Sequence, residues 1–391
     1  MRRAISWPLA SVLVCGLCGV AKGQGCQATS SPYSVSCFGA LGDGVHNDTA
    51  AIQAAITAAC ATNGAVLNFP TPSNRYMVSG ANPLAISCGL DVQATNSELY
   101  FSGTGALFYI TTGNTVRIHG FQAYGNNVAG TYFVELVSAN SLDQIYDNGI
   151  VNFGDLATGS GAGIYVNADS NSLTITKNVI SGYGTPILSN GPMDTAHIYD
   201  NQLSSTVSRC VDLSNAGGAV TMQIQHNNAT CVGGAMRIQG AGEYFIDDNE
   251  YEIGASVTNA NSAAFEFLGS GAVYATRNRC TLASHASYCI WFGAGTSNNY
   301  SLLAQTKSNG HTVAAIGSAD GTLNLSSTAA GYTQFAHNTA TTGLVYASAI
   351  GPFINGPAIA PSGSCPTNGV WVFSQDGHAT FCASGTWATK I

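Results

Sequence analysis

A repeat that ends in asparagine constrains the fold of this chain most strongly. Six short segments share that ending, and they are Ile145–Asn148, Ile175–Asn178, Ile198–Asn201, Ile224–Asn227, Ile246–Asn249 and Ala275–Asn278. Successive asparagines are 22 to 30 residues apart (249 − 227 = 22; 178 − 148 = 30). Short strands repeated at this distance are typical of a parallel β-helix, in which each coil stacks on the previous one. We expect each asparagine to occupy a left-handed bend and to bond its counterpart one coil away.

A second set of strands predicts a row of outward-facing side chains. Side chains alternate along a strand, so the apolar pairs of each coil, such as Met236/Ile238 and Phe265/Phe267, should point inward. Pro186 and Leu188 fit the same inward pattern less cleanly. The residue between each inward pair should then face outward, and this row comprises Glu135, Tyr165, Ile187, Asp212, Arg237, Glu266 and Trp291. Arg237, a scarce cation in the apolar stretch GAMRIQG, is therefore expected on the surface.

The N-terminal stretch Ser34–Pro70, SVSCFGALGDGVHNDTAAIQAAITAACATNGAVLNFP, carries a family resemblance. It resembles the opening module of the pectate-lyase-like superfamily, related to polygalacturonases and rhamnogalacturonases. This resemblance implies an all-β, right-handed parallel β-helix closed by an N-terminal capping α-helix. The residues agree, because Asn47 or Asp48 can serve as N-cap of a helix with one apolar face. The polygalacturonase motifs N-T-D, G-H-G and R-I-K are missing, so their catalytic roles are not transferred.

Composition and cysteine usage indicate a secreted, extracellular or periplasmic protein. Residues 1–23 have the basic start and apolar run of a signal peptide. We assign 24–306 to the β-helix and 307–391 to a C-terminal β-rich cap or assembly segment, which ends in a predicted hairpin. Without the signal peptide the chain has 9 Lys and Arg residues (12 − 3) and 20 Asp and Glu residues. This negative net charge argues against a nucleic-acid partner. No later stretch is apolar enough to span a membrane. Ten of the twelve cysteines remain (12 − 2), and close pairs suited to disulfides are Cys210/Cys231, Cys280/Cys289 and Cys365/Cys382.

The outward row suggests a polysaccharide-cleaving enzyme, because the resemblance implies that substrate lies in a groove over this sheet. Asp212 and Glu266 are two coils apart, about 10 Å between backbones, so their carboxyls could converge to the separation of an inverting glycoside hydrolase. Arg237 between them would keep one carboxylate ionised. We therefore name Asp212, Glu266 and Arg237 as catalytic candidates. The substrate-binding candidates are Glu135, Tyr165, Trp291, Gln239 and His285.

Two other interpretations of the same row stay open. A polysaccharide lyase would use Asp212, Glu266 and Glu135 to hold Ca²⁺ on a uronic acid, with Arg237 taking the proton next to the carboxylate. No cofactor is expected for the hydrolase, and no zinc site is indicated. A non-catalytic β-helix, such as an adhesin or a tailspike-like homotrimer, would carry the acids and Arg237 only as a surface salt-bridge ladder.

Overall fold

The computed structural model of the chain describes fourteen stretches of the sequence. They are residues 30–138, 140–168, 170–214, 221–253, 257–260, 263–269, 271–281, 288–293, 297–298, 305–307, 316–318, 371–373, 379–383 and 386–389. The chain divides into two compact units, residues 1–324 and 325–391. The signal peptide predicted at residues 1–23 lies outside the described stretches, as do Cys365 and His285.

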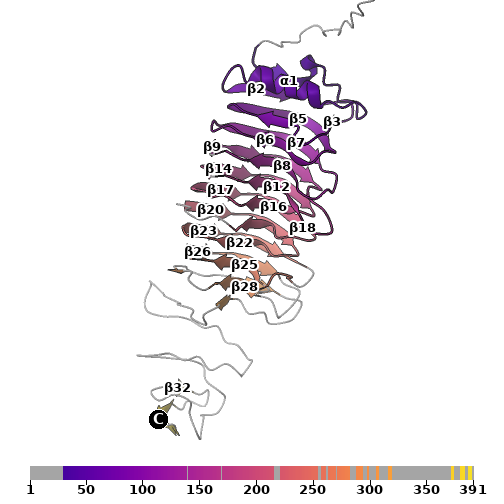
Figure 1. Cartoon of the computed structure of the whole chain (residues 1–391). Coiled ribbons are helices and arrows are strands. Elements are labelled where there is room, and N and C mark those ends of the chain that lie inside the picture. Colours follow the sequence, from indigo (N-terminus) through magenta and orange to yellow (C-terminus); the bar gives the residue numbers. More distant parts are fainter. Residues whose placement is uncertain are drawn as a thin grey trace, which may run out of the picture. The chain divides into compact units, whose positions relative to one another are not determined.

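Parallel strands form the first unit, and stacked coils are visible in Figure 1. Ten of the described strands make one sheet, and in chain order they are β4 (Leu84–Ile86), β6 (Gly105–Ile110), β8 (Thr131–Leu136), β12 (Gly161–Val166), β16 (Thr185–Ser189), β19 (Val211–Leu213), β22 (Met236–Gln239), β25 (Ala263–Leu268), β28 (Tyr288–Phe292) and β31 (Ile316–Ser318). Each of these strands pairs in parallel with the next one in this order. The predicted parallel β-helix is thereby confirmed.

The other walls of the coils form a nineteen-stranded sheet among the described residues. Its strands are β1 (Tyr33–Ser34), β2 (Ala65–Phe69), β3 (Tyr76–Val78), β5 (Leu90–Phe101), β7 (Val116–Tyr124), β10 (Gln144–Tyr146), β11 (Gly149–Val151), β14 (Leu173–Thr176), β15 (Val179–Gly182), β17 (Thr195–Tyr199), β18 (Gln202–Ser205), β20 (Thr221–Gln225), β21 (Asn228–Cys231), β23 (Glu243–Asp247), β24 (Glu250–Glu252), β26 (Ala272–Thr276), β27 (Arg279–Thr281), β29 (Ser297–Asn298) and β30 (Gln305–Lys307). Two short strands, β9 (Asn140–Ser141) and β13 (Ser170–Asn171), pair with each other.

The helix α1 (Thr49–Ala59) lies over the N-terminal end of the coils, as the sequence predicted (Figure 1). It follows a 3-10 turn, η1 (Val35–Phe38), and buries Ile52 and Ile56 against the first coil. Asp48 is the N-cap residue, but its buried carboxylate accepts hydrogen bonds from the backbone of Leu41 (2.6 Å) instead of capping α1. The GDG turn is therefore held by Asp48 and serves the cap.

The repeated asparagines form a buried ladder. Its members are Asn148, Asn178, Asn201, Asn227, Asn249 and Asn278, and the side-chain amide of each of the first five donates to the Oδ1 of the next asparagine at 2.9 to 3.1 Å. The expected left-handed bend falls one residue earlier, at Asp147, Lys177, Asp200, His226, Asp248 and Arg277, with φ between 50° and 57°. Our assignment of that bend to the asparagine was wrong, because the asparagine must point its amide into the coil to reach its counterpart.

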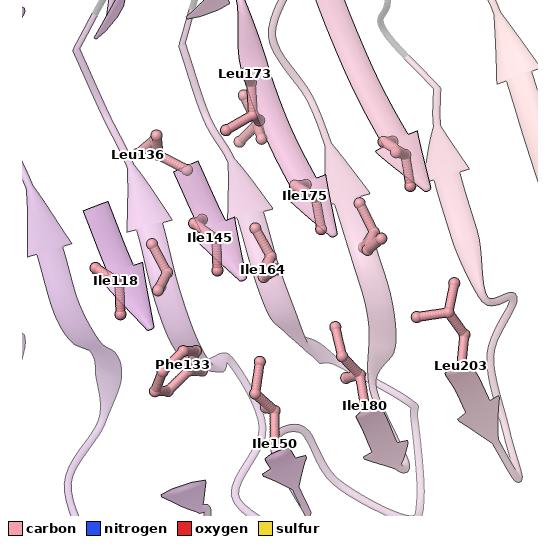
Figure 2. Packing of buried hydrophobic residues seen from close by; sticks show 14 of the residues in the cluster. Ile118, Phe133, Leu136, Ile145, Ile150, Ile164, Leu173, Ile175, Ile180 and Leu203 are labelled. Atoms are coloured by element: carbon pink, nitrogen blue, oxygen red, sulfur yellow. The ribbon is translucent and has the colours of Figure 1, made fainter. Parts of the chain in front are cut away.

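Apolar side chains from all walls fill the interior of the coils. Figure 2 shows part of this packing, in which Ile145, Ile164 and Ile175 point into the interior from neighbouring coils. Disulfides Cys60–Cys88, Cys210–Cys231 and Cys280–Cys289 add covalent links, so two of the three suggested pairs are confirmed. Disulfides are typical of proteins that fold in an oxidising compartment.

In the second unit the described residues form a small antiparallel sheet. It consists of β32 (Trp371–Phe373), β33 (Ala379–Ala383) and β34 (Thr386–Thr389), with β33 in the middle. The predicted C-terminal hairpin is therefore present.

Candidate functional site

One continuous row crosses the outer face of the ten-stranded sheet. Strand register places its members opposite one another, in the order Tyr109, Glu135, Tyr165, Leu188, Asp212, Arg237, Glu266 and Trp291. The structure thus brings together the three catalytic candidates and three of the five substrate-binding candidates. Arg237 lies three strands after Tyr165 and two strands before Trp291.

The row differs from the predicted one at a single strand. Ile187 is fully buried and pairs with the inward residue Ile164, while Leu188 takes the outward position opposite Tyr165. The physical reason is a break in alternation near the start of these strands, where two consecutive residues point inward, as Phe133 and Val134 do. In β16 this break follows Pro186, so simple alternation assigned Ile187 to the wrong face.

Arg237 is held by Asp212 on the neighbouring strand. Its Nε donates to Asp212 Oδ1 at 2.9 Å, and its Nη2 donates to Asp212 Oδ2 at 2.6 Å. This two-pronged geometry is the strong form of an arginine–carboxylate pair. The Arg237 side chain keeps 28% of its surface exposed, against 11% for Asp212. The guanidinium is therefore the part of the pair that a ligand can reach.

Glu266 has an ion-pair partner that the sequence analysis missed. Arg209, in the turn before β19, donates from Nη2 to Glu266 Oε2, and only 1% of the Glu266 side chain is exposed. The two residues are 57 positions apart in the sequence, and Arg209 reaches Glu266 from two strands away. The Nε of Arg209 is buried without a hydrogen-bond partner. The expected acid–base–acid trio is thus built as two arginine–carboxylate pairs.

At the other end of the row, a chain of hydrogen bonds connects Asn190, Tyr165, Asn167 and Glu135. Asn190 Nδ2 donates to the Tyr165 hydroxyl at 2.7 Å, this hydroxyl donates to Asn167 Oδ1 at 3.0 Å, and Asn167 Nδ2 donates to Glu135 Oε1 at 3.0 Å. These four residues come from three neighbouring coils. Asn167 and Asn190 each follow the last residue of a strand, so strand alternation did not single them out.

Burial changes the pKa of ionisable groups in and beside this chain of hydrogen bonds. Burial raises the pKa of Glu135, and the hydrogen bond from Asn167 opposes that rise. The ring of Tyr132 stacks on Tyr165, with centroids 4.7 Å apart and planes inclined by 28°. Burial also raises the pKa of Tyr132, assisted by the nearby Tyr165 and Glu135. A carboxyl with a raised pKa can stay protonated to a higher pH and donate a hydrogen bond.

The remaining substrate-binding candidates differ in position. Trp291 is half-buried in β28, opposite Glu266. Gln239 is exposed at the end of β22 and lies outside the row itself, two residues after Arg237, just as Asn167 lies two residues after Tyr165. His285 lies outside the described residues.

The arrangement around Asp212 and Glu266 does not fit a calcium ion. Both carboxylates bind guanidinium groups, whose positive charge opposes a second cation at the same oxygens. Across the part of the chain that the structure describes, no group of three or more His, Cys, Asp or Glu side chains is placed to hold a metal ion. Within the same residues, no helix is long and apolar enough to cross a membrane.

Known proteins with similar sequences are polysaccharide epimerases. No family model matches the chain. Three similar proteins are mannuronan C5-epimerases of Azotobacter vinelandii: AlgE5 is 45% identical over 73 residues (19% of this chain, 7% of AlgE5), AlgE4 is 35% identical over 102 residues (25% and 17%), and AlgE6 is 36% identical over 122 residues (29% and 13%). The matched parts thus cover less than a fifth of each relative.

Solved structures with a similar fold include an epimerase module, an alginate lyase and a surface adhesin. The AlgE6 A-module of A. vinelandii aligns with TM-score 0.38 and 16% identity over 73% of this chain and 98% of its own. An alginate lyase of Paenibacillus aligns with TM-score 0.40 and 14% identity (69% and 95%), and the Streptococcus pneumoniae surface adhesin PfbA with 0.37 and 11% (92% and 99%). At these identities the likeness concerns the fold alone. The parallel β-helix that the resemblance implied is established by the strand pairing of the chain itself.

Proposed function

We propose that the protein is an extracellular enzyme that modifies uronic-acid polysaccharides by removing the proton next to the sugar carboxylate. The observation that carries this proposal is the presence, in one row, of the hydrogen-bonded Tyr165 and of Arg237, whose guanidinium is able to bind a carboxylate. The named activity of the sequence relatives supports the same substrate class. Such proton removal is the first step of both elimination and epimerisation, so one site serves either reaction.

The reacting sugar is assigned to the end of the row that holds Tyr165. Asn190 donates to the Tyr165 oxygen and Asn167 accepts from the same hydroxyl, so the two asparagines fix its position. Tyr165 is therefore the candidate acid–base group. Glu135, with its raised pKa, and the amide of Asn167 are the candidates to offset the charge of the substrate carboxylate.

The arginine pairs are assigned to anchoring a neighbouring sugar. Three strand spacings separate Tyr165 from Arg237, about 14 Å along the sheet, so the two residues cannot act on one pyranose. The exposed guanidinium of Arg237 matches the planar shape of a carboxylate. In this arrangement Asp212 and Glu266 hold Arg237 and Arg209 in place, and Trp291 provides an aromatic contact at the far end of the row.

Hydrolysis by Asp212 and Glu266 is less well supported. An inverting hydrolase needs one carboxyl that donates a proton and one that activates water. Both carboxylates instead accept hydrogen bonds from guanidinium groups, and Glu266 is almost fully buried. The relatives by sequence are named as epimerases, not as hydrolases.

A substrate screen with two tyrosine variants tests the proposal. The protein is incubated with neutral and uronic-acid polysaccharides, with and without chelator. Ultraviolet absorbance of an unsaturated product identifies a lyase, and altered proton NMR signals without chain cleavage identify an epimerase. Tyr165→Phe should lose at least about 100-fold in rate, the usual size of an acid–base contribution. Tyr109→Phe, two strands away in the same row, is the matched control and should stay active.

Three outcomes contradict the proposal. Reducing ends released without an unsaturated product, and lost in Asp212→Asn and Glu266→Gln, would establish the hydrolase instead. Full activity of Tyr165→Phe on a uronic-acid polymer would remove Tyr165 from the reaction. Binding of a polysaccharide without any chemical change would favour the non-catalytic β-helix.

A further inference from the structure

The nineteen-stranded sheet carries a second outward row that the proposed reaction does not use. Register places His119, Tyr146, Thr176, Tyr199 and Gln225 opposite one another on five consecutive strands. Their neighbours in sequence, such as Ile145 and Ile175, point into the core (Figure 2). The row therefore faces outward, and it presents aromatic and amide side chains.

Thr176 is the unusual member of this row. It has only 8% of its surface exposed although it lies on the outer face, and its hydroxyl oxygen is buried without a hydrogen-bond partner. A buried hydroxyl left unpaired costs about 1–3 kcal/mol, and such groups are rare in folded proteins. Tyr146 and Tyr199 stand on the strands to either side of Thr176.

The spacing of the two tyrosines suits a sugar ring. Two strand spacings separate them, about 9.6 Å. A pyranose held between two aromatic faces needs a contact of about 3.5–4.0 Å on each side, or about 7–8 Å in all. Aromatic faces pack well against the apolar C–H face of a sugar, and a hydroxyl at the base can bond one of its hydroxyls.

One of the two rings is fixed in place. Tyr146 stacks on His119 with centroids 4.5 Å apart and planes inclined by 8°. His119 in turn bonds Asp91 through Nε2 at 3.0 Å. Tyr146 therefore forms a rigid wall, and Tyr199 is the ring expected to swing away from Thr176 when a ligand enters.

Charged side chains border these rings at the bend that follows each strand. Asp147, Lys177 and Asp200 directly follow Tyr146, Thr176 and Tyr199, and all three are exposed. Their left-handed backbones, with φ of 54°, 55° and 57°, set them side by side at the same point of consecutive coils. Carboxylates and an ammonium group are hydrogen-bonding partners for sugar hydroxyls.

We infer that Tyr146, Thr176 and Tyr199 form a carbohydrate-binding site for one pyranose of a polysaccharide chain, separate from the row on the ten-stranded sheet. The ring would lie between the two tyrosines, one of its hydroxyls would bond Thr176, and further hydroxyls would bond Asp147, Lys177 or Asp200. Such a site keeps the protein on its polymer while the other sheet acts on it.

Affinity electrophoresis in gels containing soluble polysaccharides tests this site. A panel of neutral and uronic-acid polymers is used, and retardation gives the dissociation constant. At least one polymer should retard the wild-type protein. Thr176→Val should weaken that binding about five- to tenfold, the worth of one hydrogen bond. The same variant should keep or raise the melting temperature, because it removes an unpaired buried hydroxyl. Tyr199→Ala should weaken binding at least as much.

Controls separate this site from the proposed reaction. Thr174→Val changes a half-buried outward threonine on the same strand and should bind as the wild type does. Tyr165→Phe should lose catalysis but keep this binding. The inference is overturned if no polymer retards the wild type, if Thr176→Val binds normally, or if Arg237→Gln rather than Thr176→Val abolishes retardation. None of these results depends on whether the protein is an epimerase or a lyase.

Discussion

Removing one amide from the asparagine ladder should destabilise the β-helix strongly. Asn201 Nδ2 donates to Ile175 O at 3.0 Å and to Asn227 Oδ1 at 2.9 Å, and its Oδ1 accepts from the Asn178 backbone N–H at 3.0 Å. Asn201→Ala leaves the Asn178 N–H and the Ile175 carbonyl without this partner inside the coil. At about 1–3 kcal/mol for each buried group, the free energy of unfolding should fall by about 2–6 kcal/mol.

Urea unfolding followed by circular dichroism measures this loss, and the matched control is Asn228→Ala. Asn228 is an exposed asparagine beside the ladder residue Asn227, so its replacement should change the unfolding free energy by less than about 0.5 kcal/mol. Hydrogen exchange should quicken most in the coils next to Asn201, because each coil of a solenoid depends on its neighbours. Equal effects of Asn201→Ala and Asn228→Ala would refute the structural role of the ladder.

Three further perturbations give expected results. Burial raises the pKa of Glu135, so the folded protein should lose stability as pH rises above the ordinary value of 4.5. Glu135→Gln should remove that loss. If the melting temperatures of the wild type and the variant change with pH in the same way, the expectation is contradicted. Backbone hydrogen bonds from His46 and Val45 lower the pKa of Asp43 to about 2, so its stabilising effect should fade as pH falls from about 4 to 2 and be absent in Asp43→Asn. Replacing Cys60 and Cys88 by alanine should cost about 3.5 kcal/mol by loop entropy, measured by thermal unfolding; an unchanged melting temperature would show that the cap needs no link.

Most of the fold could be predicted because the same contact recurs in every coil. The asparagine spacing identified the coil length, and the apolar residues two positions later, such as Ile150 and Ile180, are buried as expected. The bend itself was misplaced by one residue. The sequence alone does not distinguish an asparagine with a buried side chain from one with a left-handed backbone. Only the hydrogen bonds that the side chain makes to neighbouring coils distinguish them.

The candidate site was less predictable, because its contacts cross coils. Alternation placed Asp212, Arg237 and Glu266 in one row, but it could not reveal that Arg209, which lies outside the row, pairs with Glu266. That contact joins residues 57 positions apart in the sequence. Asn167 and Asn190 were missed for a related reason, since they lie beyond the alternating part of their strands and matter only through the Tyr165 hydroxyl.

The length of the row leads to a last prediction about substrate size. Tyr165 and Arg237 lie about 14 Å apart along the sheet, farther than one sugar ring can reach, so reaction and anchoring require different sugars of one chain. Short uronic-acid oligomers should therefore react slowly even when saturating, and the rate should rise steeply once the chain spans both residues. Arg237→Gln should reduce the rate on long chains and leave the rate on disaccharides unchanged. Initial rates on size-fractionated oligomers measure this dependence. A rate that is independent of chain length, or an equal loss on short and long chains in Arg237→Gln, would place Arg237 at the reacting sugar instead.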